Sequence, residues 1–213
     1  MLGLYIGIIL LLNIPYVQHR MSVLVAKELS TVLGSELTVG RINIGLLNRI
    51  IIDDLVLNDQ SGKELLKIGR LSAKFEILPL FSGKISIGNV QLFSFNANLE
   101  RPTPQASTNF QFVLDAFASK DTVKKKSNLD LRINSLLIRR GKVSYDVLSA
   151  ESTPGKFNPQ HIRLSNILAN ISLKALQNDS VNAAIKRMSV EEEHSGFELK
   201  KLSLKIIAND RKM

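Results

Sequence analysis

Runs in which apolar and polar residues alternate occupy most of the chain beyond Gly34, and this pattern constrains the fold more than any other feature. Alternation puts every second side chain on the same face of an extended strand, so each run predicts a β-strand with one apolar face. Residues typical of turns, such as Ser61-Gly62 and Ser82-Gly83, separate the runs. The predicted strands cover residues 36–44, 50–58, 65–75, 84–99, 129–138, 142–147, 157–173, 181–190 and 197–207, with Arg140-Gly141 as one of the turns.

A second pattern, apolar-x-x-apolar-x-apolar, recurs near the starts of these strands. Its two-residue gap followed by alternation predicts a bulge or bend in the strand. The unequal spacing of the instances argues against a tightly repeating solenoid. The instances are Val39/Ile42/Ile44, Ile52/Leu55/Leu57, Ile87/Val90/Leu92, Ile133/Leu136/Ile138, Ile185/Met188/Val190 and Leu199/Leu202/Leu204.

Few helices accompany the strands. Beyond the first residues, only 17–33 and the short run 110–117 have helical periodicity. A sheet with one apolar face needs a second layer, closure into a barrel, or an apolar ligand, and two helices are too few to cover so many strands. The last strand has no turn after it, so its edge requires a partner strand. We therefore expect a mainly β fold whose antiparallel sheet is open at its C-terminal end and is the amino-terminal part of a longer sheet that continues beyond Met213.

Residues 1–17 form an apolar segment without charge, in which Asn13 is clearly polar. A helix of this length spans about 25 Å, whereas a hydrocarbon core needs about 30 Å. We expect an uncleaved transmembrane anchor. A secretory signal peptide is the alternative, but no basic region precedes the segment and no small-residue cleavage site follows it. The predicted anchor residues are Leu2, Leu4, Ile6, Ile8, Ile9, Leu10, Leu11, Leu12, Ile14 and Val17.

The flanking charges leave the orientation of this anchor open. Arg20 and Lys27 follow the segment, and no basic residue precedes it. Because positive residues flank the cytoplasmic side of a membrane span, either the body is cytoplasmic or a basic stub before Met1 is missing.

After this segment, apolar residues recur three or four positions apart. This spacing predicts an amphipathic helix over 18–34 that ends at Gly34. We expect its apolar stripe to pack on the sheet. The stripe consists of Val17, Met21, Leu24, Val25, Leu29, Val32 and Leu33. The predicted organisation is thus an anchor at 1–17, the amphipathic helix at 18–34, a first sheet segment at 35–100, a loop with a short helix at 101–128, and a second sheet segment at 129–213.

Residues that carry enzyme chemistry are scarce. The chain has no Cys and three His, which excludes thiolate metal sites and cysteine nucleophiles. The serine-hydrolase, zinc-protease and phosphate-loop motifs do not occur. Asp53-Asp54 is interpreted as a bulge or turn, because adjacent strand residues point to opposite faces. The run Glu-Glu-Glu-His at 191–194 is interpreted as a solvated hairpin tip, and His161 as a surface residue. We expect no enzyme, no cofactor and no bound metal.

The formal net charge of +9 favours an anionic partner. A nucleic-acid surface would interleave basic residues with stacking aromatics, whereas Lys124-Lys125-Lys126 lies in a polar run without them, so we expect no nucleic acid. Anionic lipid head groups fit better beside a membrane anchor, at roughly 1 kcal/mol per basic residue near the surface. Positive charge that only keeps a β-rich chain soluble is the alternative.

Taken together, these segments resemble the amino-terminal region of the TamB-like proteins of the Gram-negative envelope, in the AsmA-like superfamily. The likeness covers essentially the whole chain and is strongest from Pro15 to Phe117. The segments that carry it are Ile-Pro-Tyr-Val-Gln at 14–18, Leu-Gly-Ser-Glu-Leu-Thr-Val-Gly at 33–40, Ile-Asp-Asp-Leu-Val-Leu-Asn-Asp at 52–59 and Asn-Phe-Gln-Phe-Val-Leu-Asp-Ala-Phe at 109–117. The last segment is most similar to the Bacteroidota branch.

The resemblance implies a single-pass inner-membrane protein with a long periplasmic body. It also implies a β-sheet trough that moves phospholipids between the inner and outer membranes, as bridge-like lipid transfer proteins do. Translocation and assembly of outer-membrane or secreted proteins, with an outer-membrane barrel as partner, is the alternative function of such proteins. We expect the lipid path to be lined by Leu55, Leu57, Leu71, Phe75, Val90, Leu92, Leu136, Ile138, Ile167, Ile171, Leu202 and Leu204.

Overall fold

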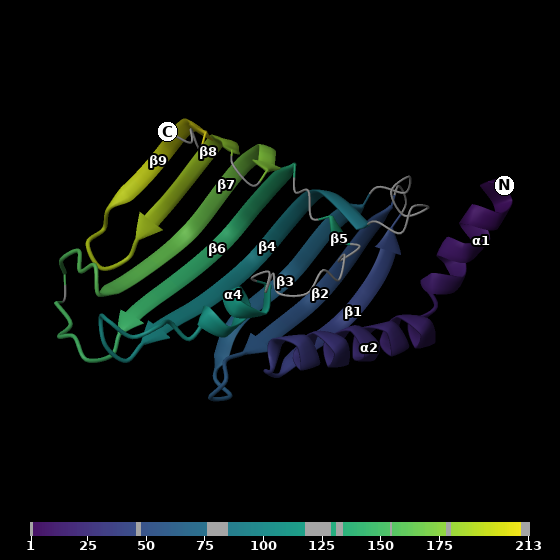
Figure 1. Cartoon of the computed structure of the whole chain (residues 1–213), viewed down its shortest axis with the longest axis horizontal. Coiled ribbons are helices and arrows are strands. Elements are labelled where there is room, and N and C mark those ends of the chain that lie inside the picture. Colours follow the sequence, from purple (N-terminus) through teal and green to yellow (C-terminus); the bar gives the residue numbers. More distant parts are fainter. Residues whose placement is uncertain are drawn as a thin grey trace.

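The computed structural model describes residues 2–45, 48–75, 85–117, 129–130, 134–153, 155–177 and 180–209. It forms one open sheet with helices at one end (Figure 1). The strands are β1 (Leu37–Gly45), β2 (Arg49–Asn58), β3 (Glu64–Phe75), β4 (Ile85–Arg101), β5 (Leu129–Asp130), β6 (Ser135–Val147), β7 (His161–Gln177), β8 (Ser180–Glu192) and β9 (Glu198–Asn209). The helices are α1 (Leu2–Leu12), α2 (Pro15–Leu33) and α4 (Gln111–Phe117). The expectation of a mainly β, unclosed fold with few helices is confirmed.

The sheet is mixed, and the expectation of a purely antiparallel sheet is wrong at its centre. Its main path runs β1-β2-β3-β4-β6-β7-β8-β9, and the short β5 pairs with β4. Neighbours on the main path are antiparallel except β4 and β6, which are parallel. Parallel neighbours need a long crossover connection. The segment that carries α4 supplies it, returning the chain to the starting end of β4.

The predicted turn at Arg140-Gly141 is also wrong, because both residues lie inside the continuous strand β6. Arg140 has a left-handed backbone (φ 55°), which makes the strand locally irregular. The Arg-Gly pair therefore resembles a turn in the sequence although it lies within a strand. Gly141 is required by its neighbour: a Cβ atom there would lie 2.2 Å from the ring of Phe95 on β4. Glycine at this position thus marks a close approach within the sheet rather than a reversal of the chain.

We expect Gly141→Ala to lower the free energy of unfolding by about 1–3 kcal/mol, because the new methyl group must displace the Phe95 ring. Urea unfolding measures this cost. In a Phe95→Ala background the same substitution should cost much less, since the obstructing ring is gone. Equal costs in the two backgrounds would show that the close approach to Phe95 is not the reason for glycine.

Two rows of apolar side chains cross all eight strands of the main path, and we call them the central rows. Cross-strand partners lie on the same face of a sheet, and so do residues two apart in a strand. The first row is Ile44, Ile50, Ala73, Val90, Leu136, Ile171, Ile185 and Leu204. The second row is Ile42, Ile52, Leu71, Leu92, Ile138, Ala169, Met188 and Leu202. The sheet therefore has one continuous apolar face.

A line of backbone irregularities runs beside the central rows. Asp54 on β2 and Ser94 on β4 have left-handed backbones (φ 56° and 53°). Each faces a glycine on the adjacent strand: a Cβ on Gly40 would lie 3.0 Å from that of Asp54, and one on Gly69 would lie 3.3 Å from that of Ser94. This line coincides with two-residue gaps in the apolar pattern, such as Val39/Ile42 and Ile52/Leu55. The predicted irregularity is present there as a left-handed residue, but the register of β1 with β2 does not shift, so it is a bend of the strand rather than a bulge.

The predicted continuous anchor helix over 1–17 is interrupted. α1 ends at Leu12 and α2 begins at Pro15, where the missing proline N–H suits a first helical turn. Within the described part of the chain, no helix combines the length and the apolar character that crossing a bilayer requires. The end of α2 is as expected: Gly34 is left-handed (φ 64°) and its N–H donates to the Ser30 carbonyl.

The expected inward stripe of α2 is only partly correct. Leu33 is buried and Leu29 packs beside it, but Leu24 and Val32 are 60% and 58% exposed. Instead, Gln18 and Ser22 are buried in the first half of the helix. Apolar residues occur on two sides of this helix. The helix packs with its polar side inward because that side meets the polar edge of β1.

Polar side chains of the N-terminal segment cover the free edge of β1. The Ser30 hydroxyl accepts from the Leu37 N–H (2.9 Å) and donates to the Leu37 carbonyl (3.3 Å). Asn13 donates from Nδ2 to the Ile44 carbonyl at 2.8 Å. An unpaired strand edge invites association with other chains, and these contacts remove that risk on the β1 side.

The most buried apolar residues gather where the helices meet the sheet. Leu33, Leu37, Leu57 and Leu65 form this core, and Leu65 is fully buried. Residues of β4 and of the α4 region pack against it: Leu99, Phe110, Phe112, Val113 and Ala116. The helices thus seal one end of the apolar face, over β1 to β4 (Figure 1).

Candidate functional site

The apolar face of the sheet is the candidate site. Eight of the twelve predicted lining residues belong to the central rows, on β3, β4, β6, β7 and β9. Leu55 and Ile167 lie beside those rows, opposite Ile68 and Gly141. Phe75 follows Ala73 by two residues on β3 and so shares its face. The structure therefore brings the predicted residues onto one surface, with Leu57 at its helix-covered end.

Burial divides this surface into a sealed part and an open part. Leu55 and Leu57 are 8% and 3% exposed, so at the end near the helices the protein's own side chains occupy the face. Val90, Leu92, Leu136 and Ile138 on β4 and β6 are only half-buried. Leu204 on β9 is 47% exposed. No helix in the described parts of the chain lies over β7, β8 or β9 (Figure 1). The face is thus more open from β4 to β9, although Ile167 and Ala169 on β7 are only 6% and 2% exposed.

The opposite face is polar and charged. On β2 and β3, Asp53 accepts from the Arg70 guanidinium at 2.6 Å, and this hydrogen bond raises the pKa of Arg70. Arg139 on β6 lies 6.0 Å over the Phe93 ring of β4. A shallow depression of about 340 Å³ is lined by Arg70 and Phe93 together with Asp53, Gly69, Ser94 and Arg140. A polar and charged face can stay in contact with water. The apolar face, in contrast, needs a second layer or an apolar ligand that shields it from water.

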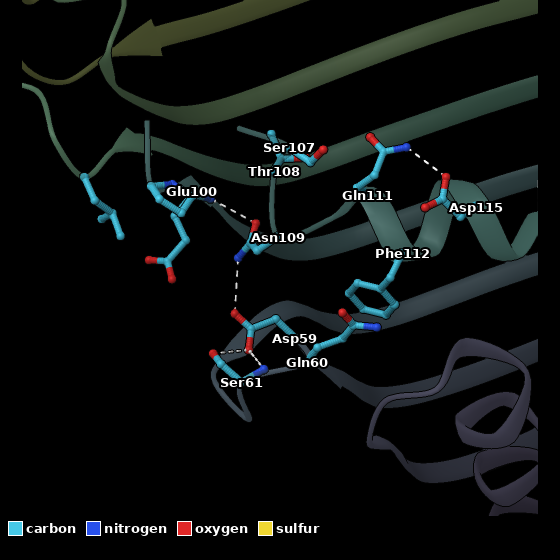
Figure 2. Close-up of a pocket in the computed structure, with 12 residues that line it drawn as sticks. Asp59, Gln60, Ser61, Glu100, Ser107, Thr108, Asn109, Gln111, Phe112 and Asp115 are labelled. Carbon is cyan, nitrogen blue, oxygen red and sulfur yellow. Dashed lines mark hydrogen bonds between the residues drawn. The ribbon is translucent and has the colours of Figure 1, made fainter. Parts of the chain in front are cut away.

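A polar cleft of about 480 Å³ lies between the β2–β3 turn and the segment that precedes α4 (Figure 2). Asn109 connects its two sides: Nδ2 donates to Asp59 at 3.4 Å, and Oδ1 accepts from the Glu100 N–H at 2.9 Å. Asp59 also accepts from Ser61 and from the Lys63 N–H. Burial raises the pKa of Asp59, but these hydrogen bonds outweigh it and hold that pKa below its usual range. The sequence pattern gives no sign of this cleft, whose Asp59 carboxylate stabilises the β2–β3 turn.

His161 is not the surface residue that the sequence suggested. Pairing of β6 with β7 brings it opposite Asp146, whose carboxylate lies 2.9 Å from Nδ1. Nε2 lies 3.0 Å from the Ala150 carbonyl. The hydrogen bond to Asp146 raises the pKa of His161. Arg163 completes the cluster at 2.8 Å from the same carboxylate. Strand register, which sequence periodicity does not reveal, creates this arrangement.

The His161 cluster predicts a pH dependence of stability. Because the folded pKa is raised, the stabilisation is complete below the unfolded pKa of about 6.5 and is lost as pH rises through the folded value. We expect urea unfolding to show lower stability at about pH 8.5 than at about pH 6. His161→Gln should remove this difference, whereas His19→Gln, at an exposed position, should keep it. An unchanged pH dependence in His161→Gln would contradict the assignment.

The run at 191–194 lies at the predicted hairpin between β8 and β9, but the expectation that it is solvated is wrong for Glu192, the last residue of β8. Glu192 is 3% exposed and accepts from Ser195 N–H at 2.7 Å and from its hydroxyl. Burial raises the pKa of Glu192, but these bonds, with those from the His194 and Arg163 N–H groups, lower it to about 2. No group of three potential metal ligands occurs among the residues that the structure describes. The carboxylate therefore stabilises the turn.

No protein-family model and no curated protein matches the chain. The apolar face is therefore interpreted from its own chemistry.

Proposed function

We propose that this chain carries phospholipid acyl chains along the apolar face of its sheet, as the membrane-proximal part of an envelope-spanning lipid transfer protein. The observation that carries the proposal is the pair of central rows, which cross eight strands without a polar interruption. From β4 to β9, the part of the face without a covering helix, four strand spacings of about 4.8 Å make each row about 19 Å long. A bilayer core of about 30 Å holds two layers of acyl chains, so one chain occupies about 15 Å. The open part of one row therefore offers space for about one acyl chain.

The energetics favour acyl chains on such a surface. Each methylene removed from water gains about 0.8 kcal/mol, so a sixteen-carbon tail gains on the order of 10 kcal/mol. Because both rows present similar aliphatic side chains on every strand, a tail that moves along them exchanges equivalent contacts. The head group stays at the polar rim, where it keeps its hydration. Transfer of this kind needs no catalytic residue.

The resemblance to TamB-like proteins supports the same proposal, in which the chain is attached to the inner membrane and the sheet lies in the periplasm. In this arrangement the sheet curves into a trough that continues toward the outer membrane. α1 is apolar throughout and uncharged, which suits contact with lipid. At 11 residues it has a length of about 16 Å, about half of a hydrocarbon core.

A second candidate function is a scaffold that assembles β-rich client proteins, with an outer-membrane barrel as partner. The observation that favours it is β9, which forms one edge of the sheet and pairs only with β8 among the described strands. An edge strand can bind a client by strand addition. This function predicts that proline substitutions in β9 harm activity more than charges on the central rows do.

Purification of the protein in detergent, followed by mass spectrometry of bound lipids, tests the proposal. We expect phospholipid to remain bound through gel filtration. Protein that contains no phospholipid but retains a β-rich client would reject lipid transfer in favour of the scaffold.

A further inference from the structure

α2 exposes apolar side chains although its other side packs on the protein. Tyr16, Val23, Leu24 and Val32 are all more than half exposed. Gln18 and Ser22, which are polar, are buried on the opposite side. In the first half of α2, the side that packs on the protein is therefore polar and the outer side is apolar. A helix whose outer side meets only water has the opposite arrangement.

Hydrogen bonds fix this orientation. Gln18 donates from Nε2 to the Asn43 side chain of β1 at 2.6 Å. The buried Ser22 hydroxyl is satisfied within the helix, where it donates to the Gln18 carbonyl at 3.0 Å. Rotation of the helix to bury Leu24 would break the hydrogen bond between Gln18 and Asn43. The apolar residues on the outer side are therefore held outward by the contacts with β1.

The outer side of α2 also carries positive charge. Arg20 and Lys27 are exposed and share this side with Tyr16, Val23 and Leu24, at helical steps of three and four. We call these five residues the outer patch of α2. The Arg20 guanidinium lies 5.5 Å over the Tyr16 ring, which holds its charge beside the apolar residues. Glu28 is the acidic residue of the helix.

We propose that the outer patch of α2 docks onto the surface of an anionic phospholipid bilayer, with the helix lying in the interface. Apolar residues between cations are the pattern of interfacial helices, in which Leu and Val enter the acyl boundary while Arg and Lys reach the head groups. The preceding helix α1 also exposes the apolar residues Ile6, Leu10 and Leu11. The docking uses residues that the apolar face of the sheet does not use.

Site-specific fluorescence tests this docking on the full chain. The protein has no Cys, so Leu24→Cys gives a single site for an environment-sensitive nitrobenzoxadiazole label. Phe197→Cys, at an exposed position on the β8–β9 hairpin, is the control. With phosphatidylcholine–phosphatidylglycerol vesicles, we expect the label at 24 to shift to the blue and to be quenched by nitroxide lipids, and the label at 197 to stay unquenched. Equal, water-like signals at both positions would overturn the proposal.

The charge requirement is tested with Arg20→Gln combined with Lys27→Gln. We expect partition into phosphatidylglycerol-containing vesicles to fall by about thirty-fold, while partition into pure phosphatidylcholine stays unchanged. The matched control is Lys200→Gln with Lys201→Gln on β9, which should bind as the wild type does. Loss of binding that is equal in the two variants would contradict a role for the patch. Phospholipid that copurifies with the apolar face should remain in both variants, so failure of docking and failure of lipid transfer are distinguishable.

Discussion

Replacing Leu92 and Leu136 together by aspartate should lower phospholipid binding by more than tenfold while the chain still folds. The two residues lie on the adjacent strands β4 and β6, one in each central row. Each is half-buried, so a carboxylate there keeps contact with water in the empty protein. An acyl chain on the same rows would remove that water, and burying an unpaired charge costs several kcal/mol.

The matched control places the same charges on the other face. Gln91→Asp with Ser135→Asp changes neighbouring residues of the same two strands, whose side chains point to the polar side. Binding of a fluorescent phospholipid should then be close to that of the wild type, and both variants should unfold thermally within a few degrees of it. Equal loss of binding in the two variants would show that lipid does not occupy the central rows.

The second large effect concerns the sealed end of the sheet. We expect Leu65→Ala to lower the free energy of unfolding by about 2–5 kcal/mol, because truncation of a fully buried leucine leaves a cavity. Leu136→Ala, at a half-buried position of the first central row, should cost about 1 kcal/mol, since less apolar surface is lost there than at a fully buried leucine. Urea unfolding monitored by circular dichroism compares the two. Similar costs at both positions would indicate that the central rows are covered by protein.

Local patterns in the sequence predict most of this sheet. Alternation predicts seven strands of the main path to within a few residues at most ends, and the two-residue gap at Ile52/Leu55 marks the left-handed Asp54. The shared face of the lining residues follows from the same patterns, because gap and alternation together determine which side chains point the same way.

Non-local contacts account for what the sequence does not show. The parallel pairing of β4 with β6 depends on where the α4 segment returns the chain, and no residue of either strand encodes it. Gly141 resembles a turn glycine unless the Phe95 ring across the sheet is known. The inward side of α2 depends on Asn43 and on the β1 edge, which turn Leu24 outward. His161 likewise finds Asp146 only through strand register.

Photocrosslinking from the sheet itself tests the central claim most directly. A benzophenone amino acid at position 138 projects from the second central row, whereas the same group at position 137 projects from the polar face, where Leu137 pairs with Gln91 and Asn170. After illumination in cells, we expect phospholipid adducts at position 138 and none at position 137. Adducts at neither position, or equally at both, would contradict an acyl path along the apolar face.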